Sequence, residues 1–300
     1  MRPVVLLITL FPAVLTLTAQ DPSTSENAEL KSAARLGAIY WPQGRYDEAE
    51  WFYQRVADLR ARLNGRDSLE YAGALLNHAK VEERVGRDVD ATRSYQEVLD
   101  LFEKLLTPGD LRVGLVAYDL GALYFSGGEI TRAEPLLLRA ASILQENSVL
   151  VDALSTLAEL YARGRFWEKS REFQLKTLQV TERIFGAGSP EIGLCLCAFA
   201  KLDAAQGHVA ETDRAYAQAV PMLEHVNASV RADTIPAPRG YVYRTFVWSG
   251  RPDDGQPSSD DRSRSVEGSI AGCLSEFAEW LRKTNRETLR RELLTRTRVP

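Results

Sequence analysis

Cysteine, histidine and methionine are scarce in this chain of 300 residues, which has three cysteines, three histidines and two methionines. Three cysteines do not make the framework of several disulfides that stabilises small secreted domains. Cys195 and Cys197 lie two residues apart on an expected helix and point to nearly opposite sides, so they cannot easily pair with each other. The sequence therefore predicts that all three cysteines, Cys273 included, are buried structural thiols.

The common active-site motifs are also absent from the sequence. It contains no His-Glu-x-x-His or Cys-x-x-Cys motif, no Gly-x-Ser-x-Gly motif and no phosphate-binding glycine loop. His78 replaces an apolar residue on an expected helix, so we expect a packed core histidine there rather than a ligand. No enzymatic activity, cofactor or bound metal is therefore expected.

Basic residues are not in excess, since 37 lysines and arginines face 41 aspartates and glutamates, for a net charge of −4. A nucleic-acid ligand needs concentrated basic side chains, so this balance argues against one. Hydrophobic residues make up 45% of the chain and charged residues 26%, which is typical of a folded, soluble protein.

A markedly apolar run occurs at the start of the sequence. Met1 and Arg2 precede apolar residues from Val4 to Leu17, and a polar stretch follows. This order is typical of a secretory signal peptide, and the run is short for a transmembrane helix. We expect a signal peptide at 1–19, a flexible mature N-terminus at 20–27, and export to the periplasm or out of the cell. An uncleaved N-terminal anchor is the alternative.

What the sequence does contain is an internal repeat. Gly44, Gly86 and Gly128 are 42 residues apart, and the step then shortens once to 37 residues before it returns to 42. Each unit carries two small residues 12 positions apart, as expected where two helices cross closely. The pairs are Gly37/Ala49, Ala79/Ala91, Gly121/Ala133, Ala158/Ser170 and Ala200/Thr212. A fixed period of this size indicates stacked supersecondary units rather than one closed globule.

The order of residues within a unit resembles the tetratricopeptide (TPR) repeat. Examples are LGAIYWPQGRYDEAEWFYQRV at 36–56, LGALYFSGGEITRAEPLLLRA at 120–140 and LAELYARGRFWEKSREFQLKT at 157–177. The long period resembles the kinesin-light-chain class of these repeats, and GAGSPEI at 186–192 resembles its inter-repeat loop. The resemblance implies an all-α protein, a right-handed α-solenoid of stacked antiparallel helix pairs, with about five units in residues 28–226.

Two segments follow the array. Residues 227–267 are expected to be an irregular insertion or disordered loop, in which the aromatic stretch 241–248 could pair as a short strand. Packing of this stretch over an exposed end of the array is the favoured interpretation, and a mobile lid or partner hook is the alternative. Residues 268–300 resemble the capping helix pair of such arrays, with Ala278 at the first small position and Asn285 at the turn. Arg290 stands where alanine is usual.

The resemblance also implies where a partner would bind, because the first helices of TPR units line a concave groove. Asn77 stands where relatives hold a peptide backbone with an amide, which can both donate and accept. The same register in later units carries Asp119, Thr156 and Ala198, so a generic solvated groove is an equal alternative. The candidate groove residues are Asn77, Lys80, Arg84, Tyr118, Phe125, Ser155, Glu159 and Lys201.

These observations favour a non-catalytic scaffold that binds a protein or peptide in its concave groove, in the cell envelope or secreted. No nucleic-acid partner and no stable membrane span after signal cleavage are expected. The alternative is a structural subunit that self-associates or packs in an envelope assembly.

Overall fold

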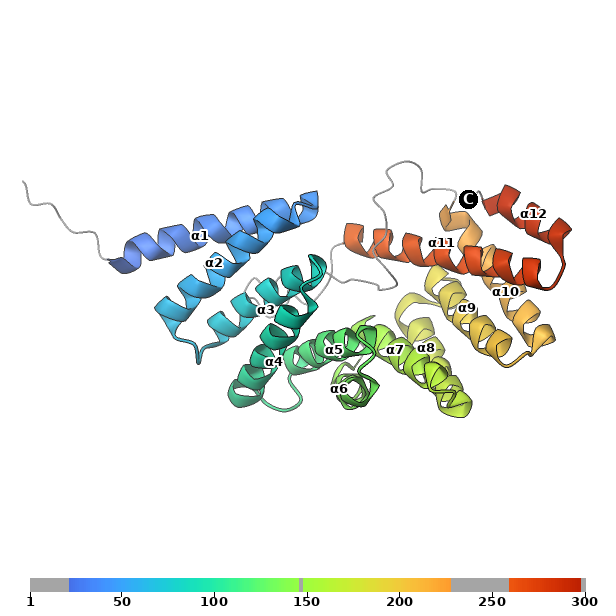
Figure 1. The fold of residues 1–300 in the computed structure, drawn as a ribbon, viewed down its shortest axis with the longest axis horizontal. Helices are drawn as coiled ribbons and strands as arrows, with labels where there is room; N and C mark the ends of the chain where they lie inside the picture. The colour runs from blue at the N-terminus through green and yellow to red at the C-terminus, as the bar shows by residue number, and fades with distance from the viewer. Residues whose placement is uncertain (1–21, 146–147, 228–258, 298–300) are drawn as a thin grey trace, which may run out of the picture.

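The structure is a computed structural model that describes residues 22–145, 148–227 and 259–297. Helices contain 86% of these residues, and none of them is in a β-strand. Consecutive helices pack as antiparallel pairs that follow one another along an arc (Figure 1). The expected solenoid of stacked helix pairs is therefore confirmed.

The described helices form six pairs, five for the repeat units and one for the C-terminal cap. The first helices are α1 (Pro22–Tyr40), α3 (Leu69–Arg84), α5 (Leu111–Ser126), α7 (Ser148–Arg163), α9 (Pro190–Ala205) and α11 (Ser259–Lys283). The second helices are α2 (Tyr46–Asn64), α4 (Asp88–Leu105), α6 (Ile130–Ile143), α8 (Trp167–Phe185), α10 (Val209–Asn227) and α12 (Glu287–Thr297). A single 3₁₀ turn, η1 (Trp41–Gln43), joins α1 to α2.

The turn inside each pair uses one residue in the left-handed conformation. Glycine takes this place in four pairs, with φ from 72° at Gly44 to 81° at Gly86. Arg165 takes it in the fourth unit with φ of 59°, and Asn285 takes it in the cap with φ of 57°. Asparagine tolerates this conformation better than most residues, which is why Asn285 could be assigned to the turn from the sequence.

The single shortening of the repeat has a structural cause. Helix α6 has 14 residues, whereas α2, α8 and α10 have 19 each. The difference of five residues equals the change in period from 42 to 37, so the whole deletion falls in the second helix of unit three. Helices α5 and α7 are in direct contact beside this short helix.

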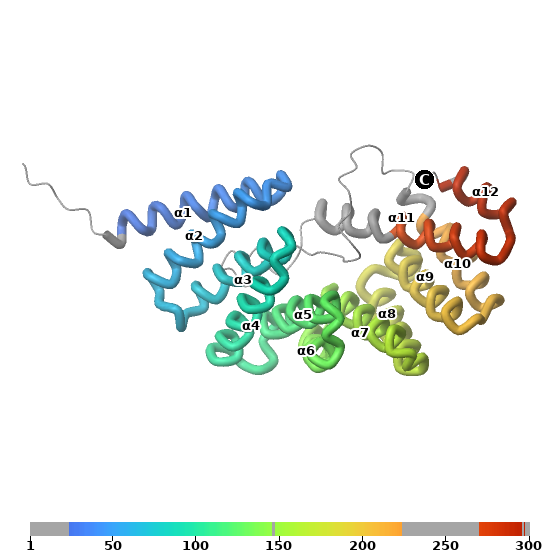
Figure 2. The backbone as a smooth tube through the Cα atoms, in the orientation of Figure 1, coloured from blue at the N-terminus to red at the C-terminus, as the bar shows by residue number. Residues whose placement is uncertain are grey.

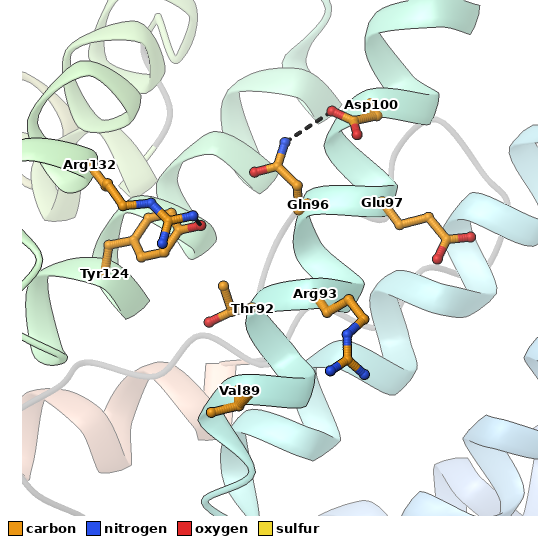
Figure 3. Close-up of a pocket in the computed structure, with 8 residues that line it drawn as sticks. All are labelled: Val89, Thr92, Arg93, Gln96, Glu97, Asp100, Tyr124 and Arg132. Carbon is orange, nitrogen blue, oxygen red and sulfur yellow. Dashed lines mark hydrogen bonds between the residues drawn. The ribbon is translucent and has the colours of Figure 1, made fainter.

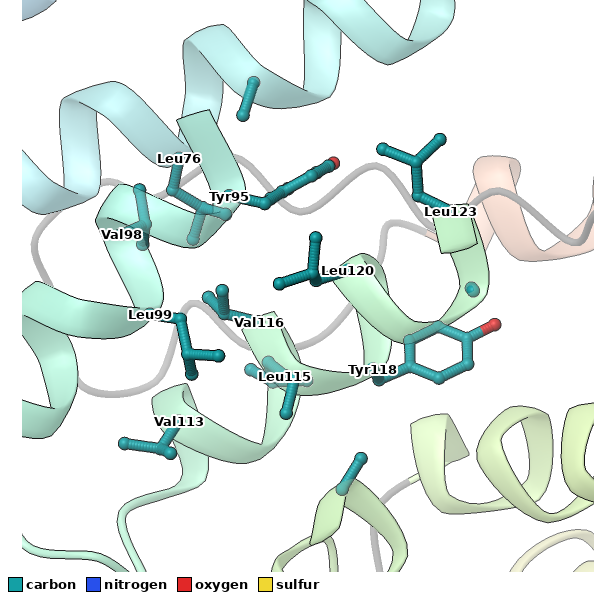
Figure 4. Close-up of a cluster of buried hydrophobic side chains, with 14 of the residues drawn as sticks. Leu76, Tyr95, Val98, Leu99, Val113, Leu115, Val116, Tyr118, Leu120 and Leu123 are labelled. Carbon is teal, nitrogen blue, oxygen red and sulfur yellow. The ribbon is translucent and has the colours of Figure 1, made fainter. Parts of the chain in front are cut away.

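The small residues lie where the two helices of a pair cross, as predicted. A Cβ added at Gly121 would lie 3.0 Å from Leu137 Cγ on the partner helix. In unit four the contact is direct, because Ser170 Oγ donates a 2.8 Å hydrogen bond to the Ala158 carbonyl. Figure 4 shows the core that forms beside these crossings, where Tyr95 packs with Leu76 and Leu120.

The apolar core of the described residues has two large clusters along the array, besides a small one of Ala49, Tyr53 and Val81. One cluster of buried side chains runs from Leu30 in unit one to Val180 in unit four, and a second runs from Cys197 to Leu293 in unit five and the cap. The boundary between α8 and α9 is partly polar. Gln174 Nε2 donates to the Ala198 carbonyl at 3.1 Å, and buried Thr181 also lies there. Polar side chains therefore take part in the contact between the two blocks.

The cysteine prediction is wrong for two of the three residues. Cys197 and Cys273 form a disulfide with their Cα atoms 6.0 Å apart, and Cys195 is free and buried. The disulfide joins α9 to α11, because the cap helix returns beside unit five after the insertion. A sequence separation of 76 residues gives no sign of this proximity.

The insertion is shorter than the sequence indicated. Helix α11 begins at Ser259, within the range 227–267 that was assigned to the insertion. The aromatic stretch 241–248 and the signal-peptide region 1–19 lie outside the described residues. Within the described part of the chain, no helix is both long enough and apolar enough to cross a membrane.

A larger side chain at a crossing should destabilise the array. We expect Gly121→Leu to lower the free energy of unfolding by roughly 1–3 kcal/mol, because an overpacked crossing forces the helices apart. The control is Gly272→Leu on α11, where an added Cβ meets no atom within 4 Å. Chemical denaturation measures both, and an unchanged midpoint for Gly121→Leu would show that the crossing tolerates the bulk.

Loss of the disulfide should weaken the C-terminal block selectively. We expect Cys197→Ser to cost about 2–4 kcal/mol, because the disulfide restricts the unfolded chain. Amide hydrogen exchange should rise in α9 to α12 and stay unchanged in α3 to α6, since the two blocks have separate cores. The control is Cys195→Ser, which removes the free thiol, and equal exchange changes in both blocks would contradict the expectation.

Candidate binding groove

The helix pairs follow an arc, and the first helices α3 and α5 lie on its inner side (Figure 2). The inward surface of the first helices α3, α5, α7 and α9 is called the concave groove below. The second helices α4 and α6 lie on the outer side of the arc. All eight candidate groove residues belong to the first helices. Their exposure differs greatly from one unit to the next.

Two of the three candidates in unit two contact neighbouring units, and the third is buried. Asn77 is buried, with 8% of its surface exposed. The Lys80 ammonium lies 3.2 Å from a carboxylate oxygen of Asp119 on α5. The Arg84 guanidinium lies over aromatic rings of unit one, 5.8 Å from the centre of Trp41 and 5.5 Å from that of Tyr46. The Lys80 and Arg84 side chains therefore link units one, two and three.

The two aromatic candidates in unit three are buried as well. Tyr118 is 9% exposed and Phe125 only 1%. The guanidinium of Arg163, on α7, covers the Phe125 ring at 4.2 Å from its centre. Phe125, although a candidate groove residue, therefore presents almost none of its ring to solvent.

The candidates in units four and five are exposed. Ser155 lies on the surface and donates a 2.7 Å hydrogen bond to the Val151 carbonyl. Glu159 pairs with Arg163 one turn later at 2.6 Å. Lys201 reaches across to Glu276 on α11 at 2.8 Å. The accessible part of the concave groove is therefore on α7 and α9.

Two carboxylates in the covered part of the groove have perturbed pKa values. Burial raises the pKa of Glu83 to about 7, and the negative charge of nearby Asp119 adds to this effect. A 2.7 Å hydrogen bond donated by the Tyr95 hydroxyl to Glu83 acts in the opposite direction. Burial also raises the pKa of Asp119, and the ammonium of Lys80 partly offsets it. Glu83 could not be recognised as buried from the sequence, because an acidic residue on a helix usually lies on a solvated face.

A cavity of about 450 Å³ lies on the outer side, between α4 and the start of α6 (Figure 3). The Arg132 guanidinium stacks over the Tyr124 ring at 3.9 Å from its centre. Val89, which also lines the cavity, is 76% exposed. The cavity is lined by Val89, Thr92, Arg93, Gln96, Glu97, Asp100, Tyr124 and Arg132. Exposed apolar and charged groups together suit a contact with another polypeptide, although no candidate from the sequence lies there.

The described residues contain no group of three or more histidine, cysteine or acidic side chains that could hold a metal ion. His78 is buried, as predicted, and its Nδ1 lies 3.6 Å from a Glu82 oxygen. Burial lowers the pKa of His78, which favours its neutral form.

The fold and the groove define a helical-repeat scaffold of the protein-interaction class. Family models identify the repeat family to which it belongs. Models described as tetratricopeptide repeat match residues 28–104, 70–146 and 150–191. These matches together cover more than half of the chain, which belongs to the tetratricopeptide-repeat family. Proteins of this family bind other proteins.

Solved structures show the same fold. The nearly identical TPR-like repeats of a Podosopora anserina protein described as a kinesin light chain superpose with a TM-score of 0.59 at 17% identity, over 70% of this chain and 100% of that one. A variant of that protein has a TM-score of 0.59 at 16% identity, over 67% of this chain and 98% of the variant. BtubC (BKLC) from P. vanneervenii has a TM-score of 0.52 at 14% identity, over 74% of this chain and 97% of BtubC. No curated protein matches the sequence.

The raised pKa of Glu83 predicts a pH dependence of stability. The folded protein keeps a proton on Glu83 between the ordinary pKa of 4.5 and about 7, whereas the unfolded chain has released it. This contribution to stability is complete below pH 4.5 and is lost as the pH rises through 7. We expect the melting temperature to fall from pH 5 to pH 8, and Glu83→Gln to reduce that fall.

The control is Glu168→Gln, at an exposed position in the first turn of α8. It should leave the pH dependence of the melting temperature as it is in the parent chain. A Glu83→Gln variant with the same fall from pH 5 to pH 8 as the parent would contradict the assignment to Glu83.

Proposed function

We propose that this protein is a non-catalytic scaffold that binds a protein or peptide partner in its concave groove, and that it acts in the cell envelope or outside the cell. Membership of the tetratricopeptide-repeat family supports the scaffold role. The absence of common catalytic motifs from the sequence is compatible with it.

The observation that carries the proposal is the exposed surface of α7 and α9. Ser155, Glu159 and Lys201 occupy groove positions and are open to solvent. They offer a hydroxyl, a carboxylate and an ammonium along one side of the arc. A polypeptide with polar and charged groups could exchange hydrogen bonds with this row.

The proposed location rests on two features. The first residues of the sequence have the order of a secretory signal peptide. The disulfide between Cys197 and Cys273 is of the kind that persists in oxidising compartments, such as the periplasm or the outside of the cell. Both features favour export.

Self-association is a second candidate function, supported by the aromatic surface of unit one. Trp51 is 60% exposed, and its ring lies edge-on to that of Phe52. Tyr40 stacks on Phe52, with ring centres 5.6 Å apart. Exposed aromatic clusters are frequent at protein interfaces.

The groove assignment can be tested with a bulky cation at its exposed part. We expect Ser155→Arg to reduce capture of the partner from cell extract by tenfold or more, roughly the effect of one lost interface hot spot. Helicity and melting temperature should not change, because Ser155 is exposed. Pull-down with quantitative mass spectrometry measures the loss.

The matched control is Ser142→Arg on α6. Ser142 is also exposed and also donates a 2.7 Å hydrogen bond to a carbonyl of its own helix. It lies on a second helix, away from the groove. If Ser142→Arg loses the partner and Ser155→Arg keeps it, the groove assignment is wrong. Self-association without any partner, abolished by Trp51→Ser, would instead favour the second function.

A further inference from the structure

One position of the repeat carries a polar contact from each unit to the next. It is the position directly after the second small residue, on the second helix of each pair. Stacked repeats give such a position similar neighbours in every unit. Four of its five occupants are charged, and each of these four bonds a residue of the following unit. The occupants are Glu50, Thr92, Glu134, Arg171 and Asp213.

A carboxylate at this position takes its donor from the next unit. Glu134 of unit three accepts a 2.6 Å hydrogen bond from the Tyr161 hydroxyl of unit four. Asp213 of unit five accepts two hydrogen bonds of 2.7 Å from the Arg286 guanidinium of the cap. Two further junctions have the pair Glu50–Arg87 and, with the charges reversed, the pair Arg171–Asp203.

The junction between units two and three has no charged residue at this position. The Thr92 hydroxyl donates a 2.7 Å hydrogen bond to the Asp88 carbonyl of its own helix. Tyr124 occupies the place on α5 that Tyr161 has on α7, 37 residues later. Its hydroxyl accepts from the Arg132 guanidinium of its own unit. The cavity of about 450 Å³ opens at this junction, so it lies where the repeat elsewhere places a charged group (Figure 3).

We propose that this cavity binds the carboxylate of an aspartate or glutamate side chain of a protein partner, on the outer side of the array. The carboxylate would replace the one that Glu134 supplies at the next junction. The Tyr124 hydroxyl and the Arg132 guanidinium would be its donors, and arginine holds carboxylates with two parallel hydrogen bonds. Arg132 now pairs with Glu129 at 2.8 Å, but both side chains are at least half exposed, so this pair can be exchanged at small cost.

The acidic residues of the lining leave the Arg132 end of the cavity open to a carboxylate. Figure 3 shows the Glu97 side chain pointing away from Arg132. Glu97 accepts a 2.8 Å hydrogen bond from the Tyr71 hydroxyl of α3. Asp100 accepts a 2.9 Å hydrogen bond from the Gln96 amide on its own helix. Each acid is therefore bound to a group other than the guanidinium.

The rest of the lining suits a peptide chain more than a free anion. Val89 is 76% exposed and offers an apolar contact to a neighbouring residue of the partner. The Gln96 amide carries donors and an acceptor, which match the groups of a peptide backbone. The cavity volume of about 450 Å³ falls in the range of roughly 300–1,000 Å³ that holds a ligand of several groups. The site lies on the outer side of the arc, so it is separate from the concave groove.

The first test compares two peptides, acetyl-Gly-Val-Glu-Val-Gly-amide and the same peptide with glutamine in place of glutamate. Titration of the full chain is followed by the amide NMR signals of α4 and α6. We expect the glutamate peptide to bind tenfold or more tightly than the glutamine peptide, because only its side chain forms charge-assisted hydrogen bonds. Arg132→Gln should abolish this preference.

The matched control is Arg139→Gln. It removes another guanidinium of α6 that pairs with a carboxylate of α4, that of Glu103. Because Arg139 does not line the cavity, the preference for the glutamate peptide should stay as it is in the parent chain.

The second test supplies the carboxylate from the chain itself. We expect Thr92→Glu to weaken binding of the glutamate peptide tenfold or more, because the new side chain would take the same donors. The melting temperature should rise by about 2 °C, since the junction gains the contact that the others have. The control is Gln54→Glu, which adds the same charge at an exposed position of α2 and should change neither quantity.

Several results would overturn the proposal. Equal affinity for the two peptides would show that the cavity does not recognise a carboxylate. An unchanged preference in Arg132→Gln, or undiminished binding in Thr92→Glu, would place the peptide elsewhere. Sodium acetate that binds as tightly as the glutamate peptide would show that the site takes a free anion and not a side chain of a protein. None of these results bears on the concave groove, which Ser155→Arg tests separately.

Discussion

The close crossing of two helices at a pair of small residues is the constraint on which the rest of this molecule depends. At Gly121 a Cβ would lie only 3.0 Å from Leu137 Cγ, and at Ala158 the partner Ser170 is near enough for a hydrogen bond. Because each crossing fixes the spacing within a pair, it also fixes which faces remain to contact the next unit. The turn geometry, the core and the groove all follow from this register.

Features that repeat could be predicted from the sequence, and contacts between distant units could not. The small pairs and the turn at Asn285 depend on local spacing, which the sequence displays directly. The Cys197–Cys273 disulfide depends on where α11 returns, and the cover of Phe125 depends on Arg163 of the following unit. Groove residues named by register alone were therefore correctly placed on the first helices, but the sequence did not show which of them are exposed.

The boundary between units four and five divides the array into two blocks of unequal construction. The first block is joined by a continuous apolar cluster, whereas the second contains only unit five and the cap and is tied by a disulfide. The buried side chains at the boundary include Gln174, which bonds the Ala198 carbonyl. Arg171 also pairs with buried Asp203 across it. Such polar contacts are directional, so they fix the relative orientation of the blocks while adding little apolar adhesion.

In the exposed part of the groove, the charged side chains can change their ion-pair partners at the smallest cost in free energy. Glu159 pairs with Arg163 and Lys201 pairs with Glu276, and all four side chains are about half exposed. Exposed ion pairs contribute about 0–1 kcal/mol each, so a partner in the proposed groove could replace them at small cost. The Lys80–Asp119 pair is different, because both side chains are largely buried and breaking it would leave a desolvated charge. Units two and three therefore form a fixed part of the groove, and units four and five form the part that the proposed partner would remodel.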